Sequence, residues 1–176
     1  VSLLTEWQHE ASHKWGHDAL QFIPRAELPN WVASDRYQAG LFDPEGGHLN
    51  PLKLALGLAA AIERAGGRIH EQSKALDYCQ ERGGYVVTTE RGRIRADVLV
   101  LACNAYLDQL DPQLSSCVLP VGTYQVATAP LAEQQAIALL PRNVCVTDNQ
   151  FVLDYFRRTP DHRLLFGGGC TYLGGM

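Results

Sequence analysis

Hydrophobic residues in the first part of the chain recur with helical spacing in two segments. Between residues 3 and 20 they return every three or four positions, which predicts an amphipathic helix. Its apolar stripe consists of Leu4, Trp7, Ala11, Trp15 and Ala19. A second helix is predicted to begin at Asn50, which can cap it ahead of Pro51, and to end at Gly66-Gly67. Its apolar face consists of Leu52, Leu56, Ala59 and Ile62, and the small residues Gly57 and Ala59–Ala61 would allow close packing on a sheet.

Shorter apolar patterns predict a series of strands. The expected strands cover residues 36–42, 68–71, 73–80, 85–90, 93–95, 98–102, 121–128, 144–147, 151–158 and 163–168. The strands between 73 and 95 should form a meander with tight turns. The run Val98–Ala102 is apolar throughout, as in a parallel strand that is covered on both faces. With a short helix near 131–139, the order predicts a mixed α/β fold.

The last predicted strands carry a turn and a glycine run. Residues 159–162 read TPDH and predict the turn of a hairpin. The run Gly167–Gly169 either lets the backbone approach another group closely or forms a tight strand exit. No helix signal follows these glycines, so they do not predict a phosphate loop.

Composition narrows the class of protein. The 176 residues are 46% hydrophobic and 19% charged, which is typical of a folded domain, and the net charge is −4. No basic block is present, so the sequence does not favour a nucleic acid or an anionic membrane as a partner. The longest apolar run is too short for a bilayer. Because the chain begins with Val1 and its one Met is Met176, we expect it to be part of something longer.

The cysteines and histidines give little sign of a metal site. Five cysteines are scattered singly, so we expect reduced, buried thiols in the cytoplasm and no zinc. His9, His13 and His17 recur at steps of four, a spacing at which two histidines could bind a metal. No carboxylate or Cys completes such a site, so the sequence favours a solvated polar face.

Candidate functional residues stand at strand ends and in the last hairpin. The run Ala102–Ala105 follows the apolar strand, where α/β sheets present backbone to ligands, and Asn104 can adopt left-handed angles or cap a following helix. His48 is either a turn residue or a ligand contact. Tyr155, Arg157 and Arg158 are candidates because Arg binds carboxylates through a bidentate fork, although a surface ion pair is the ordinary alternative.

Four of these segments resemble one known family. Residues 46–75, 96–107, 119–131 and 153–169 are similar to the FAD-dependent D-amino-acid oxidase / glycine oxidase superfamily, in the right order. The triplet Asn104-Ala105-Tyr106 most resembles its gamma-glutamylputrescine oxidase branch.

The resemblance implies a fold and a set of site residues. Residues 46–110 would be part of a Rossmann-like FAD-binding domain with a β-meander. Residues 1–45 and 111–176 would be part of a substrate domain built on an antiparallel sheet. Contacts to the cofactor FAD would come from His48, Ala75, Ala102 and Asn104. The substrate would meet Tyr155 and Arg157.

The resemblance also implies an activity. The parent enzyme would oxidise a small-molecule amine, such as gamma-glutamylputrescine, by hydride transfer to FAD, with imine hydrolysis and peroxide formation. The family's strand–GxGxxG–helix motif, the acidic residue after it and the glycine-rich C-terminal segment are absent from these residues. We therefore expect a middle portion that is inactive alone and that self-associates or needs the missing segments. The alternatives are a non-catalytic α/β binding module and a sarcosine- or glycine-oxidising relative.

Overall fold

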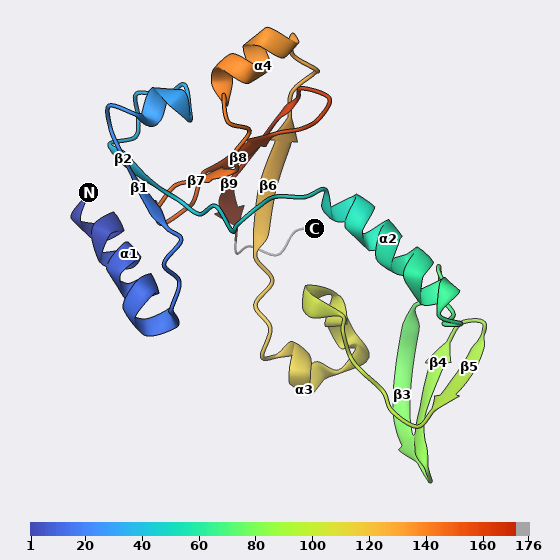
Figure 1. The fold of residues 1–176 in the computed structure, drawn as a ribbon. Helices are drawn as coiled ribbons and strands as arrows, with labels where there is room; N and C mark the ends of the chain where they lie inside the picture. Colours follow the sequence, from blue (N-terminus) through green and yellow to red (C-terminus); the bar gives the residue numbers. More distant parts are fainter. Residues whose placement is uncertain (172–176) are drawn as a thin grey trace. The chain divides into compact units, whose positions relative to one another are not determined.

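The computed structural model describes residues 1–171, which divide into two compact units (Figure 1). Unit 1 comprises Val1–Leu49 and Thr123–Thr171, and unit 2 comprises Asn50–Gly122. The fold mixes helices with antiparallel sheet and confirms the predicted α/β class. Which unit serves FAD and which serves the substrate stays a prediction, as do the boundaries expected from the resemblance, whose last residues 172–176 lie outside the described part.

Unit 1 contains a two-stranded and a four-stranded sheet. Strands β1 and β2 pair antiparallel, and the larger sheet has the order β6-β9-β8-β7. The strands are β1 Gln21–Pro24, β2 Ala39–Phe42, β6 Gly122–Ala127, β7 Val146–Thr147, β8 Tyr155–Arg158 and β9 Leu164–Thr171. The helices are α1 Ser2–Trp15, the 3-10 helix η1 Leu28–Asn30 and α4 Glu133–Leu139. Helices α1 and α4 and strands β2 and β6 to β9 confirm predicted elements, with shorter bounds for most, whereas β1 and η1 were not predicted.

The core of unit 1 is a small aromatic and aliphatic cluster. Ile23, Leu28 and Trp31 are buried together, and the Trp31 and Phe42 rings lie 4.6 Å apart. Val144, more than a hundred residues further along the chain, packs against the same cluster. The core therefore links the first segment of unit 1 to the second through an apolar contact.

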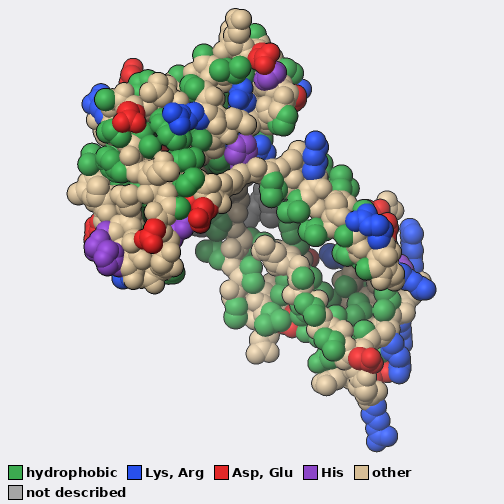
Figure 2. All heavy atoms as spheres, in the orientation of Figure 1, with side chains coloured by type: hydrophobic (Ala, Val, Ile, Leu, Met, Phe, Trp, Pro, Cys, Tyr) green, Lys and Arg blue, Asp and Glu red, His purple; other side chains and the backbone are tan. Residues whose placement is uncertain are grey.

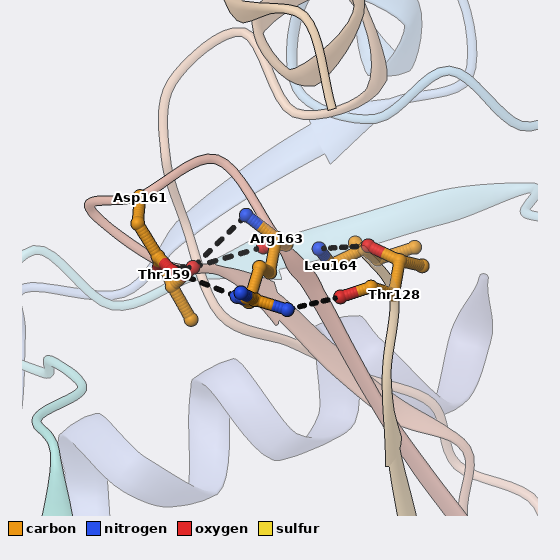
Figure 3. Close-up of polar contacts among 5 residues, drawn as sticks. All are labelled: Thr128, Thr159, Asp161, Arg163 and Leu164. Atoms are coloured by element: carbon orange, nitrogen blue, oxygen red, sulfur yellow. Dashed lines mark hydrogen bonds and ion pairs between the residues drawn. The ribbon is translucent and has the colours of Figure 1, made fainter. Parts of the chain in front are cut away.

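The turn between β8 and β9 is held by a polar cluster (Figure 3). Thr159 Oγ1 donates to Asp161 Oδ1 at 2.5 Å, and Arg163 Nε donates to Asp161 Oδ2 at 2.7 Å. These two hydrogen bonds, the Thr159 one foremost, hold the pKa of Asp161 below its ordinary value. Arg163 Nη1 also donates to the Thr128 carbonyl at 3.0 Å. The predicted hairpin is thus confirmed and tied to the end of β6.

Unit 2 combines one long helix with a three-stranded meander. The elements are α2 Pro51–Arg64, β3 Ala75–Glu81, β4 Gly84–Thr89, β5 Gly92–Ala96, the 3-10 helix η2 Asn104–Leu110 and α3 Pro112–Ser115. The strand order β3-β4-β5 confirms the predicted meander. Asn50 accepts a hydrogen bond from the Lys53 amide at 3.0 Å, and Gly66 has a φ of 84°, so both predicted helix ends are confirmed.

The packing of α2 on a sheet, which its small residues would allow, is not found among the described residues. Leu52 is 66% exposed, and Leu56 and Ile62 are exposed as well. Figure 2 shows hydrophobic side chains on the visible surface of this helix. The helical spacing gave the correct element and face, but none of the strands β3, β4 and β5 covers that face.

Two predicted strands of unit 2 are also wrong. Residues 68–71 and 98–102 pair with no strand among the described residues. Val98 and Val100 are 72% and 77% exposed, whereas Leu99 and Leu101 are half-buried, so only one side of the segment is covered. A strand that is buried on both faces needs neighbouring strands and two covering layers, which the described part of unit 2 does not provide.

The five cysteines are free but not buried. Three are exposed, and Cys103 and Cys170 are half-buried, so the expectation of small buried thiols is wrong. Within residues 1–171, no helix is long and apolar enough to cross a membrane.

The cap of α2 gives a testable prediction. Asn50→Ala should lower the free energy of unfolding by about 1 kcal/mol, because the first-turn amides lose their side-chain acceptor. Asn50→Asp keeps an acceptor and should retain most of the stability. Urea denaturation of the full-length protein measures both, and equal stability of all three proteins would show that the cap contributes nothing.

Candidate functional site

The two predicted substrate residues lie on one face of β8. Tyr155 and Arg157 are two positions apart, so their side chains leave the strand on the same side, and both are half-buried. In the antiparallel pairing with β9, Tyr155 lies opposite Gly167 and Arg157 opposite Leu165. Phe156 and Arg158 therefore belong to the other face, where the Phe156 and Phe166 rings stack at 5.7 Å.

The Tyr155 ring lies directly over the glycine run. A Cβ atom at Gly167 would overlap ring atoms of Tyr155, and one at Gly168 would lie 2.8 Å from Asp154 Oδ1. The glycines stand inside β9 and are not its exit, so the close-approach interpretation is confirmed and its partner is the Tyr155 ring. The absence of side chains there lets the aromatic ring lie flat against the sheet.

Arg157 meets a second predicted site residue, His48, from the loop before α2. Arg157 Nη1 lies 3.5 Å from His48 Nδ1, and His48 Nε2 lies 2.9 Å from the Asn143 carbonyl oxygen. Arg157 and His48 are 109 positions apart in the sequence. The fold of unit 1 therefore brings one predicted substrate contact and one predicted cofactor contact together.

Arg157 differs from other arginines of unit 1 in its surroundings. Among residues 1–171, no Asp or Glu forms an ion pair with Arg157, whereas Arg36 pairs with Asp154 and Arg163 with Asp161. A half-buried guanidinium whose neighbour is an imidazole ring and not a carboxylate keeps donors available for an external anion. This arrangement can bind a carboxylate at the β8 face.

The loop that leads into β8 is held at both ends by charged groups. Asp148 has a side chain that is 4% exposed, and its Oδ1 accepts from the Asp154 amide at 3.0 Å. Arg36 lies 2.9 Å from Asp154 and 3.6 Å from Asp148. Burial, and then the negative charge of Asp148, raises the pKa of the neighbouring Tyr37. These contacts fix where β8 begins, and hence where Tyr155 lies.

The other three predicted residues belong to unit 2. Ala75 begins β3 and lines a groove of about 480 Å³, together with Cys103 and Tyr106. Ala102 and Asn104 flank Cys103 in the sequence. Asn104 has a φ of 50°, as its residue type allows, and its Oδ1 accepts from the Ala105 amide at 2.7 Å. It is the first residue of η2, whose N-cap is Cys103 without a side-chain cap bond, so the predicted cap at Asn104 is wrong. The groove wall combines the Tyr106 ring and aliphatic side chains with the polar residues Lys74, Asp108 and Gln109.

Two polar contacts hold η2 beside β3. Lys74 Nζ lies 3.5 Å from Asp108, and Tyr78 donates to Asp111 at 2.5 Å. The Asp111 carboxylate also accepts from the Leu114 amide, and this bond, followed by the Tyr78 bond, lowers the pKa of Asp111. The contact with Asp111 in turn raises the pKa of Tyr78. The shape of the groove thus depends on residues from β3 and from the start of α3.

The sequence did not single out several of these residues. Asn143, Asp148 and Arg36 contribute to the site of unit 1, and Asp108 contributes to the groove of unit 2. The positive φ angles of Asn143 and Asp108 fit residue types that tolerate them, but many loop Asn and Asp residues have ordinary angles. The partners of these residues lie far along the chain, so no local sequence pattern marks them.

The three histidines at steps of four lie in α1 and in the loop after it. The His9 and His13 rings lie 3.8 Å apart, and His17 lies 3.3 Å from Asp43 and 3.5 Å from Glu45. No group of three or more potential ligands with metal-site geometry occurs in residues 1–171.

A family model spans all the described residues, and similar proteins match most of the chain. Residues 1–175 match the family described as DAO, FAD dependent oxidoreductase. A gamma-glutamylputrescine oxidoreductase of Escherichia coli (strain K12) is 42% identical over 95% of this chain and 39% of that protein. A probable oxidoreductase OrdL of Haemophilus influenzae is 36% identical over 93% of this chain and 39% of that protein. The chain spans about 39% of the length of these curated relatives.

Solved structures share the fold. The crystal structure of glycine oxidase from Geobacillus kaustophilus has a TM-score of 0.65 at 20% identity, over 97% of this chain and 54% of that structure. The open form of NikD, an unusual amino acid oxidase, has a TM-score of 0.61 at 18% identity, over 92% of this chain and 44% of that structure. The solved structures confirm the shared fold. The family match and the similar oxidoreductases confirm the predicted resemblance and argue against the non-catalytic module.

The contact between Tyr155 and Gly167 gives a prediction. Gly167→Ala should lower the melting temperature of the full-length protein by several degrees, because the overlap with the ring costs about 1–3 kcal/mol. Gly92→Ala is the matched control, since a Cβ there meets nothing within 4 Å. Tyr155→Leu combined with Gly167→Ala should recover part of the loss. Equal melting temperatures for the two glycine variants would contradict the close contact.

Proposed function

Because this chain belongs to the FAD dependent oxidoreductase family, we propose that it forms part of an enzyme that oxidises an amine carrying a distant carboxylate. The observation that carries the proposal is Arg157, half-buried and without an ion-pair partner in residues 1–171, beside Tyr155 on β8. Gamma-glutamylputrescine has such a carboxylate, and the similar Escherichia coli protein is named for it. A cytoplasmic location is part of this proposal.

The residues of unit 1 would bind and orient the substrate. Arg157 would hold the carboxylate through a bidentate fork, and the flat face of Tyr155 would cover the aliphatic part of the amine. Fixing the far end of the substrate limits the positions that its reacting amine can take. Such positioning lowers the activation barrier of the reaction. FAD supplies the oxidising chemistry, the acceptance of a hydride from the carbon that bears the amine.

The groove of unit 2 fits one portion of FAD. Its wall combines Ala75 and other apolar residues with the Tyr106 ring and a few polar groups, the mixture that flat aromatic groups such as adenine prefer. Ala102 and Asn104, which flank Cys103 of the groove, are proposed to lie near the cofactor as well. The pyrophosphate needs a helix N-terminus with a glycine-rich loop, and these 176 residues contain no GxGxxG motif.

A glycine- or sarcosine-oxidising enzyme is the second candidate. It is favoured by a glycine oxidase of Geobacillus kaustophilus that is 27% identical over 88% of this chain and 37% of that protein. In such a substrate the carboxylate lies beside the reacting amine. Rates of the full-length enzyme on glycine, sarcosine and gamma-glutamylputrescine would separate the two candidates.

Arg157 provides the test of the proposed function. Arg157→Lys in the full-length enzyme should raise KM for gamma-glutamylputrescine about tenfold or more, because one bidentate pair contributes about 1.5–3 kcal/mol. Putrescine, which lacks the carboxylate, should be little affected. Arg158→Lys is the matched control on the opposite face of β8 and should change neither KM. Equal losses on both amines would assign Arg157 a structural role and remove the support for the carboxylate.

Cofactor binding by this chain alone gives a further prediction. Residues 1–176 mixed with excess FAD should quench little flavin fluorescence and release no peroxide with any amine. A few neutral hydrogen bonds contribute only about 0.5–1.5 kcal/mol each, which cannot replace a phosphate-binding loop. Stoichiometric FAD binding with amine-dependent peroxide would show that the 176 residues suffice.

A further inference from the structure

His48 has a polar neighbour at each of its ring nitrogens. Its Nε2 lies 2.9 Å from the Asn143 carbonyl oxygen, and its Nδ1 lies 3.5 Å from Arg157 Nη1, at the long end of the hydrogen-bond range. The ring is half-buried between a loop and the β8 face. Both directions in which an imidazole can form hydrogen bonds are therefore occupied by groups of unit 1.

These neighbours define the proton positions on the ring. A carbonyl oxygen only accepts, so Nε2 must carry hydrogen and donate to Asn143. A guanidinium only donates, so Nδ1 must hold a free lone pair towards Arg157. The contacts thus select the neutral imidazole with hydrogen on Nε2, and a protonated ring would place a second positive charge against Arg157.

The Asn143 end of this chain of contacts is fixed by the core. The Asn143 amide donates to the Leu140 carbonyl at 3.1 Å, and Leu140 is 1% exposed. Asn143 has a φ of 52°, a left-handed conformation that an Asn adopts more readily than most residues. The carbonyl that accepts from His48 therefore belongs to a defined turn at the end of α4.

We propose that His48 is a positioning residue, which fixes the guanidinium of Arg157 through its unprotonated Nδ1. Arg157 has no carboxylate partner in residues 1–171, so a neutral acceptor orients it without neutralising its charge. The remaining N–H groups of the fork stay available for a substrate carboxylate. The identity of that anion rests on the proposed function. This role of His48 differs from the contact with FAD that the resemblance implied.

The kinetic test uses the full-length enzyme with two amines. His48→Leu should raise KM for gamma-glutamylputrescine about three- to tenfold, the effect of losing one hydrogen bond, with a smaller change in kcat. The KM for putrescine should change little. His48→Gln offers one amide acceptor and one donor and should restore most of the affinity. His70→Leu, an exposed histidine of unit 2, is the matched control and should behave as the wild type.

A double-mutant cycle decides whether His48 acts through Arg157. In an Arg157→Ala background, His48→Leu should produce no further rise in KM. An equal loss on both amines, or a full additional loss in the Arg157→Ala background, would overturn the positioning role.

A spectroscopic test does not depend on enzyme turnover. ¹⁵N NMR of histidine-labelled full-length protein should show His48 as the neutral form with hydrogen on Nε2, and Arg157→Ala should shift its Nδ1 resonance. A proton on Nδ1, or an unchanged Nδ1 resonance, would overturn the inference. If Arg157→Ala leaves both KM values unchanged, the proposed carboxylate site fails, and the NMR result alone decides the contact between His48 and Arg157.

Discussion

The pairing of β8 with β9 is the constraint on which the site of unit 1 depends. It sets Tyr155 opposite Gly167, and the missing side chain allows the ring to lie against the sheet. The same register puts Arg157 on the face of Tyr155 and leaves Phe156 for the other face. A shift by one residue would exchange these faces, because side chains alternate along a strand. The polar cluster at the turn and the charged contacts at the start of β8 both stabilise this register.

On this face of β8, the proposed binding residue Arg157 has an uncharged neighbour and free hydrogen-bond donors. Arg36 and Arg163 are held by carboxylates and serve the structure, whereas Arg157 faces a histidine ring. An arginine that is neutralised inside the protein has little to offer an anion, while an unsupported one has a high conformational entropy. A neutral acceptor such as His48 restricts the conformations of the guanidinium and leaves its positive charge available.

Unit 2 is held together by local contacts and leaves more apolar surface exposed. Its meander and its groove are formed by local pairing and by contacts such as Tyr78 with Asp111. Its helix α2 and the segment Val98–Ala102 leave large apolar side chains exposed. Exposed apolar surface of this kind marks regions that contact other groups or associate. The curated relatives are about two and a half times as long as this chain, and we expect the whole protein to cover these surfaces.

The sequence by itself determined the helix caps, the meander, the last hairpin and the family, because each signal lies within a few residues or in the order of motifs. It also identified Tyr155 and Arg157 as neighbours on one strand. Only the tertiary structure decided that His48 meets Arg157 and that Val98–Ala102 is covered on one side alone. The physical reason is distance along the chain: an apolar run shows what a segment can bury, while its burial depends on which distant segments pack against it.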